Sequence, residues 1–251
     1  MKRLFTLACA LAFLISVAAA AQGPIRVLVL TGNVTQEEYP VLSQFQTIGS
    51  FQFEWAQTAD RSLPGLENYD ILWIGQGEIC ENAYFFDAAT ETKIKDFVAN
   101  GGIVISIGQD SDDGRPCEDG WLPVDLIGVE RGGTEVFEVT NAPEVGSLFE
   151  KPNQVNTAHF DDAWTAPPPE IILLATINNG QDVGIGLLPH GDGYYIVTSL
   201  ENESASDVQT NQLIIENLLL YAAELLASAS TPVEPLGKAA VLWGAVKANH
   251  R

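Results

Sequence analysis

The fold is decided by residues 69–110, which read YDILWIGQGEICENAYFFDAATETKIKDFVANGGIVISIGQD. Two apolar runs predict buried strands, and a segment with a helical period lies between them. Ile94 and Val98 fall on the apolar face of that helix, and Gly101 marks its end. Strand, helix and strand in this order predict a parallel βαβ unit. The three elements are expected at 69–74, 88–100 and 103–107.

Strands before this unit extend the same pattern. The apolar run at 25–30 predicts a strand that is covered on both faces, and the alternation at 51–55 predicts another. Between them, Thr35 and Glu38 form a capping box that opens a helix expected to run to about Ile48. We therefore predict an α/β fold of the flavodoxin-like, doubly wound type, with a mostly parallel sheet and helices on both faces.

The second half of the chain predicts β-hairpins. Turn-forming residues at 178–180 and 190–193 separate apolar segments. An amphipathic helix at 207–227 closes the domain, and 159–169 is expected to be a loop. The predicted strands cover 136–139, 171–175, 183–188 and 194–199.

The chain begins with the features of a secretory signal. Basic residues are followed by an apolar run at 4–17 and then by small residues, which predicts a cleaved signal peptide at 1–21. The alternative is a transmembrane anchor, which needs about 20 apolar residues. We expect an extracytoplasmic protein, periplasmic or secreted, with no stable membrane anchor after cleavage. It has one domain at 22–227.

A linker and a short tail follow at 228–251. The tail combines an apolar group with some of the few basic residues of the chain. One interpretation is a short docking or export-sorting segment, and the other is a loose terminus. The basic residues are Lys238, Lys247 and Arg251, and the apolar group is Leu242, Trp243 and Val246.

The charge of the chain limits its partners. It has 33 acidic residues against 12 basic ones, for a formal net charge of −21. Such a chain repels nucleic acid and anionic lipid, so neither is an expected partner. Solubility in salty or cell-wall surroundings explains the acidity better than a specific cationic ligand does.

Two cysteines, Cys80 and Cys117, follow the signal segment. In an oxidising compartment, two cysteines predict one disulfide. The loops that carry them follow two parallel strands, so both are expected at the same end of the sheet. The alternative is a reactive cysteine at either position.

Two polar clusters are candidate sites. His159 lies near Asp161, Asp162 and Trp164, and a His beside carboxylates can bind a metal or act as a general base. The alternative for this cluster is a solvated loop anchored by Trp164. A second, acidic cluster follows the strand at 103–107, and its oxygen ligands suit Ca²⁺, although charge runs are usually solvated. Its metal-ligand candidates are Asp110, Asp112 and Asp113, with Glu118 and Asp119 nearby.

Several motifs, taken in order, resemble the class I glutamine amidotransferase-like superfamily. The chain looks closest to its trehalose-utilisation (ThuA-like) and β-galactosidase-trimerisation branches. The resemblance covers residues 24 to 226. It rests on YDILWIGQG at 69–77, FVANGG at 97–102, VNTAH at 155–159 and GDGYYIVTS at 191–199.

The resemblance implies a site at the turn after the strand at 103–107. Catalytic members carry a Cys there, and a His–Glu pair moves the protons. Gly108 takes the position of the Cys, and 200–203 holds acids but no His. The resemblance thus implies a pseudoenzyme that binds a small molecule, a carbohydrate or a cell-envelope partner, with no cofactor. The expected crevice is lined by Gly75, Gln76, Gly77, Glu78, Gln109, Asp110 and Trp164.

Two other functions remain open. The first is a hydrolase, with or without a metal, that uses His159 with Asp161, Asp162 or Asp110. The second is a structural or assembly module that has no small-molecule site. The sequence leaves the question of enzymatic activity undecided, with the missing Cys and His favouring no activity.

Overall fold

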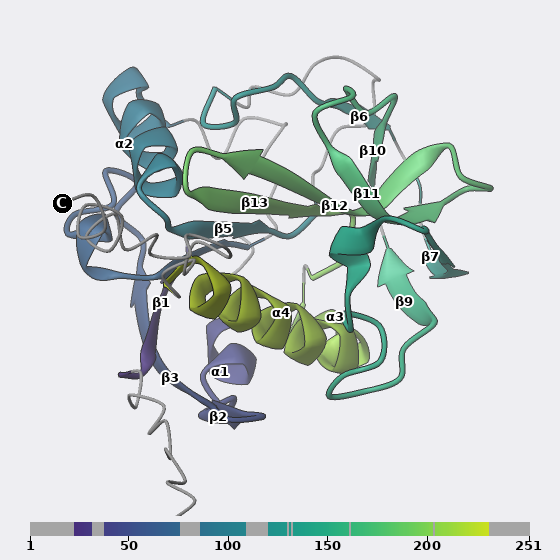
Figure 1. Cartoon of the computed structure of the whole chain (residues 1–251), viewed down its shortest axis with the longest axis horizontal. Helices are drawn as coiled ribbons and strands as arrows, with labels where there is room; N and C mark the ends of the chain where they lie inside the picture. The colour runs from purple at the N-terminus through teal and green to yellow at the C-terminus, as the bar shows by residue number, and fades with distance from the viewer. Residues whose placement is uncertain are drawn as a thin grey trace, which may run out of the picture.

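Five parallel strands form the centre of the sheet in the computed structural model (Figure 1). Their order, β3-β1-β4-β5-β13, is the 2-1-3-4-5 order of flavodoxin-like sheets. The prediction of an α/β fold with a mostly parallel central sheet is confirmed. The strands are β1 (Ile25–Leu30), β3 (Phe51–Thr58), β4 (Ile71–Ile74), β5 (Ile103–Ser106) and β13 (Gly193–Thr198). The structure describes residues 23–31, 38–75, 86–108, 120–129, 131, 133–160, 162–202 and 204–230.

Antiparallel strands extend the sheet beyond β13. β12 pairs with β13 across the turn at Gly191, whose φ of 61° suits glycine. β11 pairs with β12 across a turn in which Asn178 and Asn179 both have positive φ. The strands of this extension are β6 (Ile127–Val129), β8 (Glu138–Val139), β10 (Ala163–Thr165), β11 (Ile172–Ile177) and β12 (Asp182–His190). β2 (Thr47–Ile48) lies at the other edge beside β3, and β7 (Gly133–Val136) and β9 (Thr157–Phe160) form a separate two-stranded sheet.

The sheet separates two cores because successive side chains of a strand point to opposite faces. Val27 and Val29 of β1 lie in one core with the buried residues of α1 and α4, while Leu28 and Leu30 lie in the other with those of α2. Figure 1 accordingly shows α2 on one side of the sheet and α1 and α4 on the other. The helices are α1 (Glu38–Leu42), α2 (Ala88–Ala99), α3 (Ala205–Thr210) and α4 (Gln212–Ser230), with short 3₁₀ turns at Leu66–Asn68 and Pro143–Val145.

Helix α2 forms as its sequence predicts. The Asp87 side chain caps its start by accepting a hydrogen bond from the Thr90 backbone N–H at 2.7 Å. Ile94 and Val98 are fully buried, and Gly101 follows the helix with a φ of 99°. These local signals agree with the packing, which explains why the helix bounds were predictable.

Three predicted elements differ from the structure. The helix expected to reach Ile48 ends at Leu42, because the chain turns at Gly49 and pairs β2 with β3. The helix expected at 207–227 starts earlier, where Ser204 and Asp207 form a capping box, and is divided at Asn211 into α3 and α4. The segment at 159–169 was expected to be a loop but contributes β9 and β10 to sheets.

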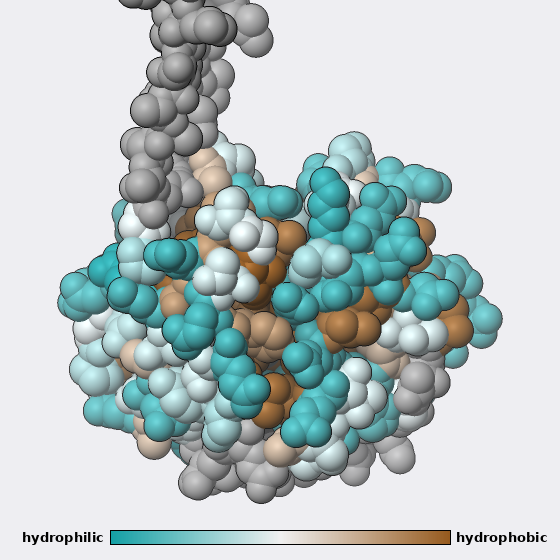
Figure 2. All heavy atoms as spheres, turned by 90° about the horizontal axis from the view of Figure 1, so that it is seen from below, coloured by the Kyte–Doolittle hydropathy of each residue, from teal (hydrophilic) through white to brown (hydrophobic). Residues whose placement is uncertain are grey.

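Helix α4 is tied to the loop at 148–153 by Asn217, which is fully buried. Its Nδ2 donates to the backbone carbonyls of Leu148 and Asn153 at 2.7 and 2.8 Å, and its Oδ1 accepts from the Asn153 backbone N–H at 3.0 Å. By length and composition, α4 could cross a membrane, but half of its apolar stretch Gln212–Ala229 is buried inside the fold. The outer surface on this side is mostly hydrophilic, with apolar side chains visible in patches (Figure 2).

Candidate functional site

The parallel strands end at one edge of the sheet, which we call the carboxyl edge. Ligands of open α/β sheets bind at this edge. Its described residues are Thr31, Gly75, Ile107, Gly108 and the segment Ser199–Asn202. Gly75, one of the predicted crevice residues, is buried at the end of β4. The other loop residues predicted for the crevice lie outside the described residues, namely Gln76, Gly77, Glu78, Gln109 and Asp110.

A buried carboxyl group is the main polar feature of this edge. Glu38, the first residue of α1, is fully buried. Its Oε1 accepts hydrogen bonds from Trp73 Nε1 at 3.1 Å and from Asn202 Nδ2 at 2.7 Å. Its Oε2 is buried and has no hydrogen-bond partner among the described residues. The cluster thus joins α1, β4 and the segment after β13.

Burial changes the acidity of Glu38. Desolvation raises its pKa from 4.5 to about 7, while the hydrogen bonds from Asn202 and Trp73 act in the opposite direction. Desolvation prevails because a charged carboxylate away from water is costly even with two donors. The group therefore changes its protonation near neutral pH. As an acid, it donates through one oxygen, and as a carboxylate it accepts through both.

The turn after β5 carries the second feature. Gly108 has a φ of 60°, a left-handed conformation that favours glycine. Just before it, Ser106 is buried, and its backbone carbonyl accepts from Thr198 Oγ1 at 3.0 Å. The Ser106 hydroxyl itself has no partner among the described residues. The turn therefore offers backbone groups and no reactive side chain at position 108.

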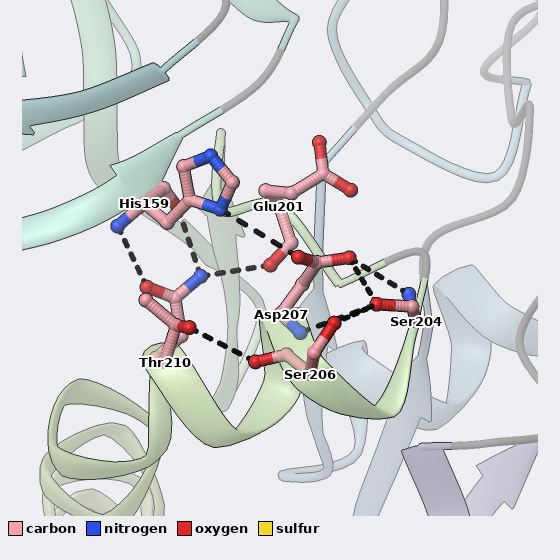
Figure 3. Close-up of polar contacts among 7 residues, drawn as sticks. His159, Glu201, Ser204, Ser206, Asp207 and Thr210 are labelled. Carbon is pink, nitrogen blue, oxygen red and sulfur yellow. Dashed lines mark hydrogen bonds and ion pairs between the residues drawn. The ribbon is translucent and has the colours of Figure 1, made fainter.

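His159 lies beside this edge, but its acidic partner is not one that the sequence predicted. His159 Nδ1 lies 3.8 Å from Oδ1 of Asp207, at the start of α3 (Figure 3). Both side chains are about one-quarter exposed. Asn211 brackets the backbone of His159, accepting from its N–H and donating to its carbonyl, each at 2.8 Å. These contacts fix the strand, so His159 is positioned by α3.

The Ser204 hydroxyl completes the group in Figure 3 without contacting His159. It donates to Asp207 Oδ2 at 2.6 Å and lies 2.7 Å from the Ser206 hydroxyl. A nucleophilic Ser needs a His as its immediate base, whereas here the carboxylate lies between the two. Ser204 also accepts from the Asp207 backbone N–H as part of the capping box. The arrangement is that of a helix cap.

Asp162 and Trp164 do not line an open crevice. Asp162 is 3% exposed, and its carboxylate accepts from the backbone N–H of Arg131. Trp164 is fully buried in β10, and its Nε1 donates to the Thr198 carbonyl at 3.1 Å. Its indole fills a core because it belongs to a strand of the main sheet, so Trp164 has no surface to offer a ligand.

The remaining site predictions fall on residues outside the described ranges. These residues are Asp161, the metal candidates Asp110, Asp112 and Asp113, and the cysteines Cys80 and Cys117. Within the described part of the chain, no group of three or more His, Cys, Asp or Glu side chains could hold a metal ion. The Ca²⁺ site and the disulfide therefore stay predictions.

Sequence reasoning missed the cluster around Glu38. The spacing from Thr35 predicted a helix-capping role for Glu38, but its side chain instead accepts hydrogen bonds from Trp73 and Asn202. One signal was present, because a Trp in a buried strand needs an acceptor for its indole N–H. The residue that supplies the acceptor could not be identified from the sequence.

Comparison with solved structures identifies the fold. A protein described as ThuA-like from Bacteroides uniformis matches with a TM-score of 0.54 and 12% identity, over 84% of this chain and 95% of its own. One described as a GMP synthase subunit from Thermoplasma acidophilum matches with a TM-score of 0.52 and 13% identity, over 82% and 96%. The β-galactosidase from Rahnella sp. R3 matches with a TM-score of 0.55 and 11% identity, over 82% of this chain but 31% of its own. No protein-family model and no curated protein sequence matches the chain.

Proposed function

We propose that this chain, whose fold is that of the class I glutamine amidotransferase-like proteins, is an exported binding module with its ligand site at the carboxyl edge. The observation that carries the proposal is Gly108. Catalytic members need a thiolate at the turn after this strand to attack an amide carbonyl. Gly108 has the left-handed backbone of a tight turn but no side chain to attack with. Export rests on the signal peptide expected at 1–21.

The proton-transfer groups support the same proposal. In catalytic members a His–Glu pair follows the last parallel strand. In this chain the segment after β13 is Leu200-Glu201-Asn202, and its described side chains include no His. Asn202 instead donates to Glu38. A side chain that is committed to holding a buried carboxyl group is suited to shaping a binding site.

The chemistry of the edge favours a neutral, hydroxyl-rich ligand. A net charge of −21 opposes anionic ligands. Oε2 of Glu38 is buried and has no hydrogen-bond partner among the described residues, so the proposal requires that ligand binding exposes it; it can then accept from a hydroxyl when ionised and donate to one when protonated. Sugar hydroxyls both donate and accept, so they match the group in either state. We therefore favour a neutral carbohydrate, free or part of the cell envelope, as the ligand.

A ligand screen on the mature chain tests this proposal. A saccharide at 100 times its Kd should stabilise the protein by about 2.7 kcal/mol and raise Tm measurably. Measured above pH 7, where Glu38 is ionised, the shift should be smaller in the Glu38→Gln variant, because an amide at the position of Oε2 donates but cannot accept, whereas Glu170→Gln on the exposed surface should keep the shift. No shift with any neutral saccharide, or equal shifts in both variants, would exclude the site. Release of ammonia from glutamine would disprove the non-catalytic assignment.

The metal-assisted hydrolase built on His159 has one supporting contact, between His159 and Asp207. Three variants separate it from the binding module. Esterase or glycosidase activity that is lost in both His159→Ala and Asp207→Asn, but kept in Glu38→Gln, would favour the hydrolase. Saccharide binding that survives His159→Ala and is lost in Glu38→Gln would favour the binding module.

A further inference from the structure

Two adjoining hollows lie at the opposite edge of the sheet, where the parallel strands begin. Their volumes are about 630 Å³ and about 1020 Å³. They share one wall, so we treat them together as the amino-edge groove. The residues common to both hollows are Arg26, Asp70, Asn100, Gly101 and Leu226. This groove lies at the edge opposite the proposed ligand site, and the sequence motifs did not point to it.

The floor of the amino-edge groove is partly apolar. Tyr69, Phe97 and Leu226 contribute half-buried apolar surface to it. Phe97 packs directly over the backbone of Gly102, where an added Cβ would lie 2.4 Å from its ring. A half-buried aromatic surface inside a hollow of this size is suited to receive an apolar side chain.

The rim of the groove is acidic. The two lining cations are already engaged, because Arg26 forms an ion pair with Asp70 at 3.3 Å and Lys93 donates to the Ser62 carbonyl. The other lining acids form no ion pair with any described residue. They are Glu54, Glu67, Asp96 and Asp192. The groove thus favours an occupant that is both apolar and basic.

We propose that the occupant is the C-terminal segment of this same chain, residues 238–251. Helix α4 ends at Ser230, and Leu226 and Ala229 near its end line the groove, so the following residues leave the helix beside it. The eight residues 231–238 can span at most about 28 Å, which suffices because the groove begins at the helix end.

The composition of this segment matches the groove. It carries three basic side chains and no acidic one, which complements the acids of the rim. It also carries Leu242 and Trp243, and a Trp is the kind of residue that anchors an interface in an apolar pocket. A segment joined to its own site by a short linker has an effective concentration in the millimolar range, so weak contacts suffice to hold it.

Trypsin sensitivity of the mature full-length chain tests the proposal. Trypsin cleaves after Lys238 and Lys247, and mass spectrometry measures the rate at each bond. A docked segment should be cleaved about 5-fold more slowly than a synthetic peptide of residues 231–251. This holds if the effective concentration of the segment is a few times its Kd for the amino-edge groove. Adding 0.5 M NaCl should raise the rate in the chain and not in the peptide, because salt screens the charges of the rim.

Variants show whether the groove holds the segment. The double change Glu67→Gln and Asp96→Asn should speed cleavage about 2- to 4-fold, since each exposed pair contributes little alone. Trp243→Ala should speed cleavage in the chain but not in the peptide. The surface change Glu170→Gln should have no effect. All of these changes are at exposed positions or in the tail, so folding should be kept.

Three outcomes would overturn the proposal. The first is a cleavage rate in the chain equal to that of the peptide. The second is protection from trypsin that is unchanged by both the groove substitutions and Trp243→Ala, which would place the segment elsewhere. The third is protection that grows with protein concentration, which would mean that the tail of a second copy fills the groove. Failure of the saccharide screen does not bear on this proposal, because the two sites lie at opposite edges of the sheet.

Discussion

Replacing the buried Glu38 by Gln should remove a specific part of the pH dependence of stability. The folded-state pKa of Glu38, about 7, lies above its unfolded value of 4.5, so the folded protein binds this proton more tightly. The resulting stability is present in full below about pH 4.5 and is lost as the pH rises through about 7. At 1.36 kcal/mol per pKa unit, the full effect is about 3 kcal/mol, of which about 2.5 kcal/mol lies between pH 5 and pH 9.

Urea unfolding of both proteins at pH 5 and pH 9 measures this effect. Gln keeps an oxygen for Trp73 and Asn202 and does not titrate. From pH 5 to pH 9 the free energy of unfolding of the variant should therefore rise by about 2.5 kcal/mol relative to that of the wild type. All other titrating groups are common to both proteins and cancel in the difference. Glu170→Gln, which removes an exposed carboxylate, should change the difference by less than about 0.5 kcal/mol. A gain below about 1 kcal/mol for Glu38→Gln, or a loss, would refute the reasoning.

Three further substitutions test how the fold is held. Asn217→Ala should lower the free energy of unfolding by about 3 kcal/mol, because it leaves the buried Leu148 carbonyl and the half-buried Asn153 carbonyl without this donor; a loss below about 1 kcal/mol in urea would contradict this. Gly193→Ala should cost at least about 3 kcal/mol, since the new Cβ would lie 2.2 Å from the Gly102 carbonyl oxygen, whereas Gly23→Ala, with open space around it, should leave Tm unchanged. Ser204→Ala should cost about 1 kcal/mol through loss of the cap, and an unchanged Tm would show that the cap is dispensable.

The elements that the sequence predicted well are those in which a local signal and the packing agree. The apolar runs of β1, β4 and β5 and the helix α2 carry their own boundaries in turn and capping residues such as Asp87 and Gly101. The prediction was wrong where a distant contact decided the outcome. Residues 47–48 form a strand because β3 pairs with them, and α3 and α4 are separate helices that meet at Asn211, whose side chain binds the backbone of His159.

The residues of the candidate site likewise include some that the sequence predicted and some that it did not. The positions of Gly75 and Gly108 at the strand ends followed from the sequence pattern, because parallel strands must end at a common edge. The partner of His159 did not, since Asp207 is 48 positions away, on a helix that packs against β9. The sequence placed acids next to His159 along the chain, and the fold turns one of them, Asp162, into a buried position.

The α/β architecture with a mostly parallel sheet and the lack of a side chain at the turn after β5 follow from the order of residues along the chain, whereas the position of β13 as the fifth parallel strand is seen only in the folded structure. The cluster of Glu38, Trp73 and Asn202 at that edge depends on the folded structure. Glu38 meets Trp73 across 35 residues and Asn202 across 164, so no local pattern encodes the contact. Local periodicity reports which face of an element is buried, whereas the pairing of two buried polar groups depends on where the sheet brings their elements together.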